Sequence, residues 1–266
     1  MSFADGPVEG TGGIVRHISF SNITGTVVTK PTALDNSTMT GVSNPGEQRS
    51  CIILNCVPGN TIEHITLRDI HLTFGGGGTA DDAARRELPL IANEYFSLGP
   101  MPAYGLYARN ARAVTLSHVR FDLATPDLRP AVIFDRVRDA SIFGLAAEAT
   151  TQAESLLRFI DATDVLVTAP RVLTPASVFL RVEGRESAAI TLEGGDLSRP
   201  RSRSSSPPAR PDVRSRCAVL PLAAAERDVV MAVKPGPRKR SAGGRGGAGF
   251  SGLPPTNQST KPVKFV

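Results

Sequence analysis

Residues 61–70 read TIEHITLRDI, and the spacing of their apolar side chains decides the fold. Two residues separate Ile62 from Ile65, one separates Ile65 from Leu67, and two separate Leu67 from Ile70. The central alternation, in which every second residue is apolar, is typical of a β-strand with one buried face. The stretch therefore predicts a strand and not a helix.

The same spacing recurs along the chain. Measured on the second apolar position, the copies follow one another at intervals of 47, 49, 26, 25 and 25 residues; they begin at Val15, Ile62, Ala111, Val137, Ala162 and Ser187. A fixed period of roughly 20–50 residues indicates a repeat protein whose units bury their apolar faces against one another. Each long interval corresponds either to two units or to one unit with an insertion.

One strand every 25 residues or so predicts an all-β fold, a right-handed parallel β-helix in which successive coils stack into a solenoid. Leucine-rich repeats are the nearest alternative, but their L-x-x-L-x-L-x-x-N pattern does not recur here. In the predicted stack, Leu67, Leu116 and Ile142 point inward at equivalent positions. Without a preceding coil, the strand edge at residues 14–28 is unpaired unless residues 1–13 cover it, which favours self-association or aggregation.

The composition divides the chain into a lead-in (1–13), a β-helix (14–198) and a basic tail (199–266). Within the β-helix, Gly75–Gly78 opens a loop excursion that extends to about residue 102. Thr79 and Asp82 have the spacing of a helix capping box, which predicts a helix over residues 80–88 that stops before Pro89. The tail is rich in Arg, Ser, Pro and Gly, a composition that predicts disorder.

The charge is distributed unevenly between these segments. Residues 1–197 carry 16 Lys and Arg against 22 Asp and Glu, whereas residues 198–266 carry 14 against 3. The basic tail suggests nucleic-acid binding as one function, but no stacking aromatics or folded module accompany its charges, so we expect this function less than the others. No apolar run reaches the roughly 18 residues of a membrane span, and the N-terminus lacks the features of a signal peptide.

Three segments carry a resemblance to a known family. They are GIVRHISFSNITGTVV, CIILNCVPGNTIEHITLRDIHLTFGGGGTADDAARRELP and MPAYGLYARNARAVTLSHVRFDL. Over roughly residues 10–198 the chain resembles the C-terminal half of bacterial glycoside hydrolase family 28, the polygalacturonase-like enzymes. The resemblance implies a right-handed parallel β-helix and a pectic, galacturonan-like polysaccharide as the partner. Family members are often secreted or periplasmic; the compartment of this chain stays open.

The catalytic motifs of that family do not occur in this sequence. They are an N-T-D segment, an Asp-Asp pair followed by Cys or a similar residue, a G-H-G segment and an R-I-K segment, all of which precede the matched stretch in the family. We therefore expect a C-terminal portion of a pectin-degrading glycoside hydrolase that is inactive alone. A non-catalytic structural or carbohydrate-binding β-helix is the alternative. No catalytic residue, cofactor or metal site is predicted.

Tyr104, Tyr107 and Arg109 are the candidate substrate-binding residues, because aromatic and Arg side chains near a coil edge suit a sugar. Packing in the core or at a turn is the competing interpretation of all three. The one adjacent Asp pair, Asp81–Asp82, stands at the predicted helix start, where carboxylates cap the backbone.

Several polar residues recur at equivalent repeat positions. His17 and His64 both precede the second apolar residue, and we expect them on the surface, one coil apart. Asn22, Asp69 and His118 align at a later position, which favours hydrogen bonding along the stack. A structural role is the simpler interpretation of both sets.

Overall fold

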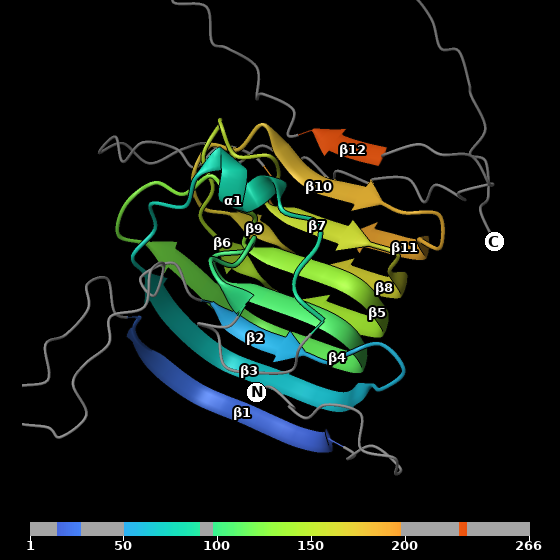
Figure 1. Ribbon diagram of the computed structural model, residues 1–266. Coiled ribbons are helices and arrows are strands. Elements are labelled where there is room, and N and C mark those ends of the chain that lie inside the picture. Colours follow the sequence, from blue (N-terminus) through green and yellow to red (C-terminus); the bar gives the residue numbers. More distant parts are fainter. Residues whose placement is uncertain (1–14, 28–50, 91–97, 198–228, 233–266) are drawn as a thin grey trace, which may run out of the picture. The chain divides into compact units, whose positions relative to one another are not determined.

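The computed structural model describes residues 15–27, 51–90, 98–197 and 229–232, and strands dominate this part of the chain (Figure 1). Twelve strands form one sheet, and every pairing among the first eleven is parallel. The elements are β1 (Val15–Thr26), β2 (Ile52–Asn55), β3 (Ile62–Phe74), α1 (Ala80–Ala84), β4 (Leu106–Leu123), β5 (Val132–Phe143), β6 (Ala146–Ala147), β7 (Leu157–Ile160), β8 (Thr163–Thr168), β9 (Arg171–Val172), β10 (Val178–Glu183), β11 (Ala188–Glu193) and β12 (Val229–Ala232).

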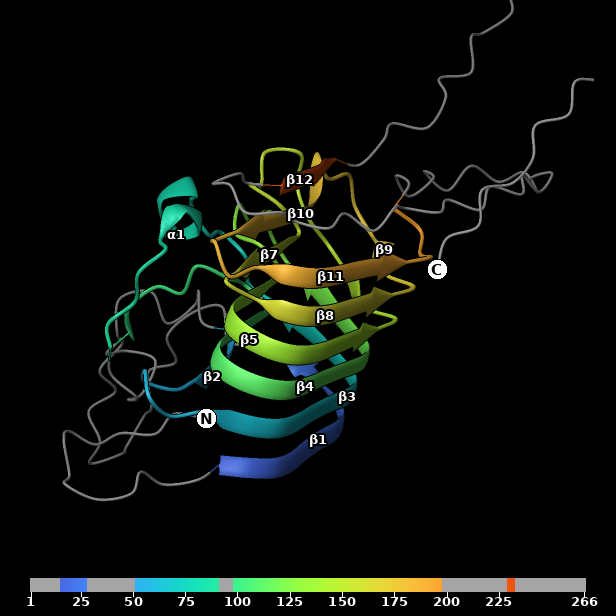
Figure 2. The same cartoon turned by 90° about the vertical axis from the view of Figure 1, so that its right-hand side faces the viewer.

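The parallel strands pair in three ladders. The first ladder runs β1–β3–β4–β5–β8–β11, and its strands lie one above the other in Figure 2. The second ladder contains β2, the first residues of β4 and β5, then β7 and β10. The third contains the last residues of β3 and β4, then β6 and β9. Strands β3, β4 and β5 therefore each take part in more than one ladder.

The repeat in the sequence is the register of the first ladder. Phe20 pairs with Leu67, Leu67 with Leu116, and Leu116 with Ile142. The next partners, Val167 and Leu192, continue the same column. Strands β1, β3 and β4 are direct neighbours, so each long sequence interval is one unit with an insertion and not two units.

Left-handed backbone conformations explain the two-residue gaps in the repeat. In a plain strand, residues three apart point to opposite faces. Here the second residue of each gap has a positive φ, so the chain bends and both flanking apolar side chains face inward. In the first gap these residues are His17, His64, Ala113, Asp139, Asp164 and Ala189, with φ between 53° and 59°. In the second gap they are Asn22, Asp69, His118, Gly144, Ala169 and Gly194.

The core is a continuous column of apolar side chains inside these bends. Leu67, Leu116 and Ile142 are each at most 1 % exposed, as predicted from the alternation. The second ladder contributes residues such as Phe134 and Phe159, whose rings stack with centroids 5.2 Å apart. Burial of each such side chain contributes about 1.5–3 kcal/mol to the free energy of unfolding.

The predicted helix over residues 80–88 is wrong in its length. Helix α1 ends at Ala84, and Arg85 already has extended dihedrals (φ −64°, ψ 122°). The chain leaves the helix there because its side chains bind elsewhere. Arg85 donates hydrogen bonds to the carbonyl oxygens of Leu98 and Pro100, and Arg86 pairs with Glu183 on β10 and with Glu154, which precedes β7.

The tail (199–266), whose composition predicts disorder outside a short, more apolar stretch (217–233), contributes one strand within that stretch. Strand β12 pairs antiparallel with β10, with Leu180 opposite Met231. The remainder of the predicted tail and the lead-in lie outside the described residues. At the other end of the first ladder, β1 pairs with β3, and the described residues include no strand on its second edge.

The burial of Leu116 gives a direct test of the register. We expect Leu116→Asp to cost several kcal/mol in the free energy of unfolding, because it buries a carboxylate without a partner. The melting temperature should fall by about 10 °C or more. Thr115→Asp on the outward side of the same strand is the matched control and should change it little. Equal melting temperatures for the two variants would contradict the assigned register.

The left-handed positions give a second test. We expect Ala113→Val to destabilise the protein by about 1–2 kcal/mol, because a β-branched side chain is strained at positive φ. Ala113→Gly should be neutral or stabilising, since glycine adopts this conformation without strain. Ala111→Gly, two residues earlier in the same strand, should lose about 0.5–1 kcal/mol. Denaturant unfolding measures all three, and equal losses for the two glycine variants would refute the explanation of the bends.

Candidate functional site

The excursion between β3 and β4 covers the outward face of the second ladder. We call this the covered face; it is formed by the outward side chains of β2, β4, β5, β7 and β10. Leu88, Leu98 and Met101 of the excursion form a separate apolar cluster with Tyr107 and Ile133 of the strands. The cluster is distinct from the main apolar core, so the strands are buried on both sides here.

The three predicted substrate-binding residues are buried. Tyr107 and Arg109 lie on the covered face and are 2 % and 1 % exposed. The Tyr107 hydroxyl donates to Asp135 over 2.8 Å, and Arg109 donates to the Asn55 side chain and to the carbonyl oxygens of Leu88 and Pro89. All these contacts are packing contacts within the protein, and neither side chain presents a surface to a sugar.

Tyr104 lies in the main apolar core and not on the covered face. It is fully buried, contacts Phe74 edge to face at 5.9 Å between ring centroids, and donates its hydroxyl to the Glu148 carbonyl oxygen. Burial raises its pKa well above the ordinary value for tyrosine. The competing interpretation, packing in the core, describes all three residues.

At the glycine run the excursion packs against Arg129, a buried arginine that no sequence motif marks. Asp127 accepts a hydrogen bond from the Gly78 amide and two from the Arg129 guanidinium, whose own side chain is almost fully buried. A Cβ on Gly78 would lie 2.0 Å from Arg129 Nε, so this position has no room for another side chain. Gly78 thus serves close packing and not phosphate binding.

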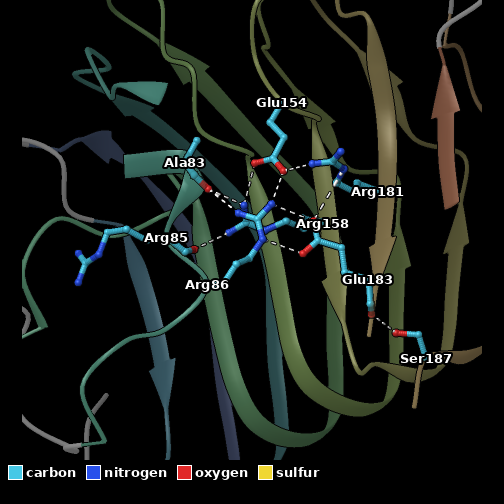
Figure 3. A network of polar contacts seen from close by, with 8 residues as sticks. All are labelled: Ala83, Arg85, Arg86, Glu154, Arg158, Arg181, Glu183 and Ser187. Carbon is cyan, nitrogen blue, oxygen red and sulfur yellow. Dashed lines mark hydrogen bonds and ion pairs between the residues drawn. The ribbon is translucent and has the colours of Figure 1, made fainter. Parts of the chain in front are cut away.

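A cluster of five charged residues joins the excursion to β7, β10 and the bend before β7 (Figure 3). Arg86 binds the two oxygens of Glu183 through Nε and Nη2, at 2.7 and 2.9 Å. Glu154 is bound by Arg86, Arg158 and Arg181 together. We call these five side chains the charge cluster; in Figure 3 they converge between α1 and strands β7 and β10.

The charge cluster also fixes the backbone of the excursion. Arg158, which is 0 % exposed, donates to the carbonyl oxygens of Ala83 and Arg85 at 2.5 and 3.2 Å. Arg86 shares the Ala83 carbonyl at 3.0 Å. These carbonyls end a short helix and have no partner within it, so the arginines satisfy acceptors that burial would otherwise leave unpaired.

Beside the charge cluster lies a hollow of about 340 Å³. Ala80, Ala83 and Ala84 of the excursion form one wall, and Arg86, Arg181, Glu154 and Gln152 provide its polar atoms. Burial alone would raise the pKa of Glu154, but the charge of Arg158 and the hydrogen bonds from Arg181 and Arg86 outweigh it and hold this pKa below its ordinary value. Glu154 is therefore ionised at neutral pH.

A larger open groove of about 650 Å³ crosses the outer surface of the first ladder. Four successive strands line it, because its residues include Glu63 of β3, Arg112 of β4, Arg138 of β5 and Thr163 of β8. We call it the inter-coil groove. Its charged residues are three arginines and four carboxylates: Arg112, Arg136, Arg138, Glu63, Asp139, Asp164 and Glu186.

The groove contains two arginines on neighbouring strands. Arg112 and Arg138 are directly paired in the register, and their like charges repel each other. Arg138 lies 3.7 Å from Glu186, and Arg136 donates to Asn110 over 3.1 Å. Arg112 makes no hydrogen bond or ion pair with any residue that the structure describes.

The remaining predicted positions have structural roles. Asp82 accepts from the Thr79 amide at 2.9 Å and Thr79 Oγ1 accepts from the Asp82 amide at 3.1 Å, which confirms the capping box. The exposed His17 and His64 rings stack 4.7 Å apart, one coil above the other, as expected. In the second polar column, His118 Nδ1 lies 3.5 Å from Asp69 Oδ1.

Comparisons of the chain with family models, with curated proteins and with solved structures give no match. Within the described residues no group of His, Cys, Asp and Glu is arranged to hold a metal ion. No helix in the same residues has the length and apolar character needed to cross a membrane.

The charge cluster predicts a pH-dependent stability. Because the folded pKa of Glu154 lies below the ordinary value of 4.5, its ion pairs stabilise the protein above that pH, and the contribution is lost as the pH falls through the folded pKa. We expect Glu154→Gln to lose about 1–3 kcal/mol at pH 7 and the difference from wild type to shrink below about pH 4. Urea unfolding of both proteins across this pH range measures the difference in their free energies of unfolding.

The matched control is Glu186→Gln, which removes an exposed carboxylate from a surface ion pair and should cost well under 1 kcal/mol. A Glu154→Gln loss that stays constant from pH 7 to pH 3 would contradict the electrostatic origin.

Proposed function

We propose that the described body is a right-handed parallel β-helix of the polygalacturonase-like type that binds a pectic polysaccharide and, as this chain stands, does not hydrolyse it. The observation that carries the proposal is the inter-coil groove, which equivalent positions of four successive strands line. A groove that crosses the strands suits an extended polymer lying along the stacking direction, since each coil repeats the same contact about 4.8 Å further on.

The groove presents three arginines, which suit the carboxylates of an acidic sugar chain, and four carboxylates, which suit its hydroxyl groups. Guanidinium groups bind carboxylates through paired hydrogen bonds, and Arg112 and Arg138 present two such groups on adjacent strands. Asp139, Asp164 and Thr163 offer oxygens to sugar hydroxyls. A bound carboxylate would also relieve the repulsion between the two arginines.

The absence of hydrolysis rests on the state of the carboxyl groups. Inverting glycoside hydrolysis needs one carboxylic acid that stays protonated and one carboxylate base, placed roughly 6.5–9.5 Å apart on either side of the sugar. Burial raises the pKa of the Asp135 carboxyl, which is a property that a general acid needs. It lies beneath the excursion, bonded to Tyr107, and does not line the groove.

One set of measurements tests binding and hydrolysis separately. We expect polygalacturonate to retard the folded protein in affinity electrophoresis, and the double variant Arg112→Gln/Arg138→Gln to lose at least tenfold in affinity. Higher salt should weaken binding, because the pairs are exposed. Reducing-sugar release from polygalacturonate should stay at the level of a protein-free blank.

Arg68→Gln, which removes an exposed arginine outside the groove, is the control and should bind like wild type. Absence of polysaccharide binding by the wild-type protein would refute the proposed function. Turnover that disappears with one Asp or Glu substitution would refute the non-hydrolytic part.

A further inference from the structure

We propose that the hollow beside the charge cluster is a second binding site, which takes the carboxylate of a small hydroxyl-bearing acid on Arg181. The site is separate from the inter-coil groove and does not depend on the proposed function. It lies between α1 and strand β10, against the three alanines of the excursion.

The charge cluster carries a net positive charge. Arg86, Arg158 and Arg181 provide three positive charges, and Glu154 and Glu183 provide two negative charges, which leaves a net charge of +1. The five side chains are between 0 and 34 % exposed, so water compensates this charge only in part. An anion in the adjoining hollow would balance it, as partly buried charges require.

The guanidinium of Arg181 keeps a nitrogen that makes no hydrogen bond to the described residues. Its Nη1 donates to Glu154, whereas its Nε is buried, lies 3.8 Å from Glu183 Oε1 and makes no hydrogen bond. Its Nη2 has no hydrogen bond to the described residues. Because Nε is enclosed by the protein, a ligand in the hollow reaches Arg181 through Nη2, where a carboxylate can accept a charge-assisted hydrogen bond.

The contrast with the other two arginines shows why Arg181 is the binding residue. Arg86 uses Nε, Nη1 and Nη2, and Arg158 uses Nη1 and Nη2, to hold the excursion and the carboxylates. Arg158 does not line the hollow. Arg181 alone among the three both lines the hollow and keeps most of its donors.

The volume and the remaining lining residues of the hollow indicate the chemical class of the ligand. A volume of about 340 Å³ lies at the lower end of the roughly 300–1,000 Å³ of small-molecule sites. The Glu154 carboxylate and the Gln152 amide lie on its wall and accept hydrogen bonds from hydroxyl groups. The three alanines leave room for a ring. An acidic sugar and an open-chain hydroxy acid share this chemistry.

Calorimetric titration of the full chain distinguishes these sources. D-galacturonate is the ring-bearing probe, lactate the open-chain probe and D-galactose the neutral one. We expect the carboxylates to bind and galactose not to bind, with galacturonate the tighter of the two. Arg181→Gln should weaken binding at least tenfold, while Arg86 and Arg158 continue to hold Glu154.

A second variant keeps the test independent of the charge cluster. Ala84→Leu fills the hollow from an exposed helix position without touching a charge, and it should also abolish binding. Arg171→Gln removes an exposed arginine elsewhere and should bind like wild type. Thermal unfolding verifies that each variant is folded. Absence of carboxylate binding by wild type, equal binding of galactose, or unchanged affinity in Arg181→Gln or Ala84→Leu would overturn the proposal.

Discussion

The fold depends on a backbone constraint: at two places in each unit of the repeat, a single residue adopts positive φ. Without these bends, the four apolar positions of a unit would divide between the two faces of a strand. With them, all four face inward and the strands remain continuous and parallel. Because the bends stack at φ between 51° and 59° from unit to unit wherever the residue is not glycine, each strand presents the next one with the same path to follow. The register and the apolar core both result from this repetition.

The excursion covers the outward face of the second ladder. Its strands carry large side chains such as Tyr107, Arg109 and Arg158 outward, and the excursion buries them. Most of the polar groups are paired, because the arginines end on backbone carbonyls of the excursion and on nearby carboxylates, whereas Arg158 Nε and Arg181 Nε make no hydrogen bond. A covered parallel sheet with both faces buried is the common arrangement for parallel strands.

The first ladder was predictable in detail from the sequence, and the covered face was not. The repeat spacing yields the strand pairing residue for residue, since apolar periodicity reflects burial directly. The column of Asn22, Asp69 and His118 also carried the signal for the bends, because Asn, Asp and His are enriched at positive φ. For the aromatic and Arg residues after the excursion, the sequence left sugar contact and packing as alternatives, because nothing local reveals that a segment 20 residues earlier folds back over Tyr107 and Arg109.

The same limit applies to the charge cluster. Arg86 and Glu183 are 97 residues apart, so no sequence pattern connects them. The length of α1 was overestimated for a related reason: Arg85 and Arg86 favour a helix by propensity, but their bonds to distant groups draw the backbone out of it.

The position of the excursion in the chain has a consequence for biosynthesis. Residues 80–90 leave the ribosome before β7 and β10, to which they bind. At roughly 5–20 residues per second, the 97 residues that separate Arg86 from Glu183 take on the order of 5–20 s to synthesise. Throughout that interval the strands already made can pair with one another, but Arg86 lacks its carboxylate partner on β10. Until β10 is made, the excursion is held by fewer contacts than in the finished protein, and this is the stage at which a chaperone would have most effect.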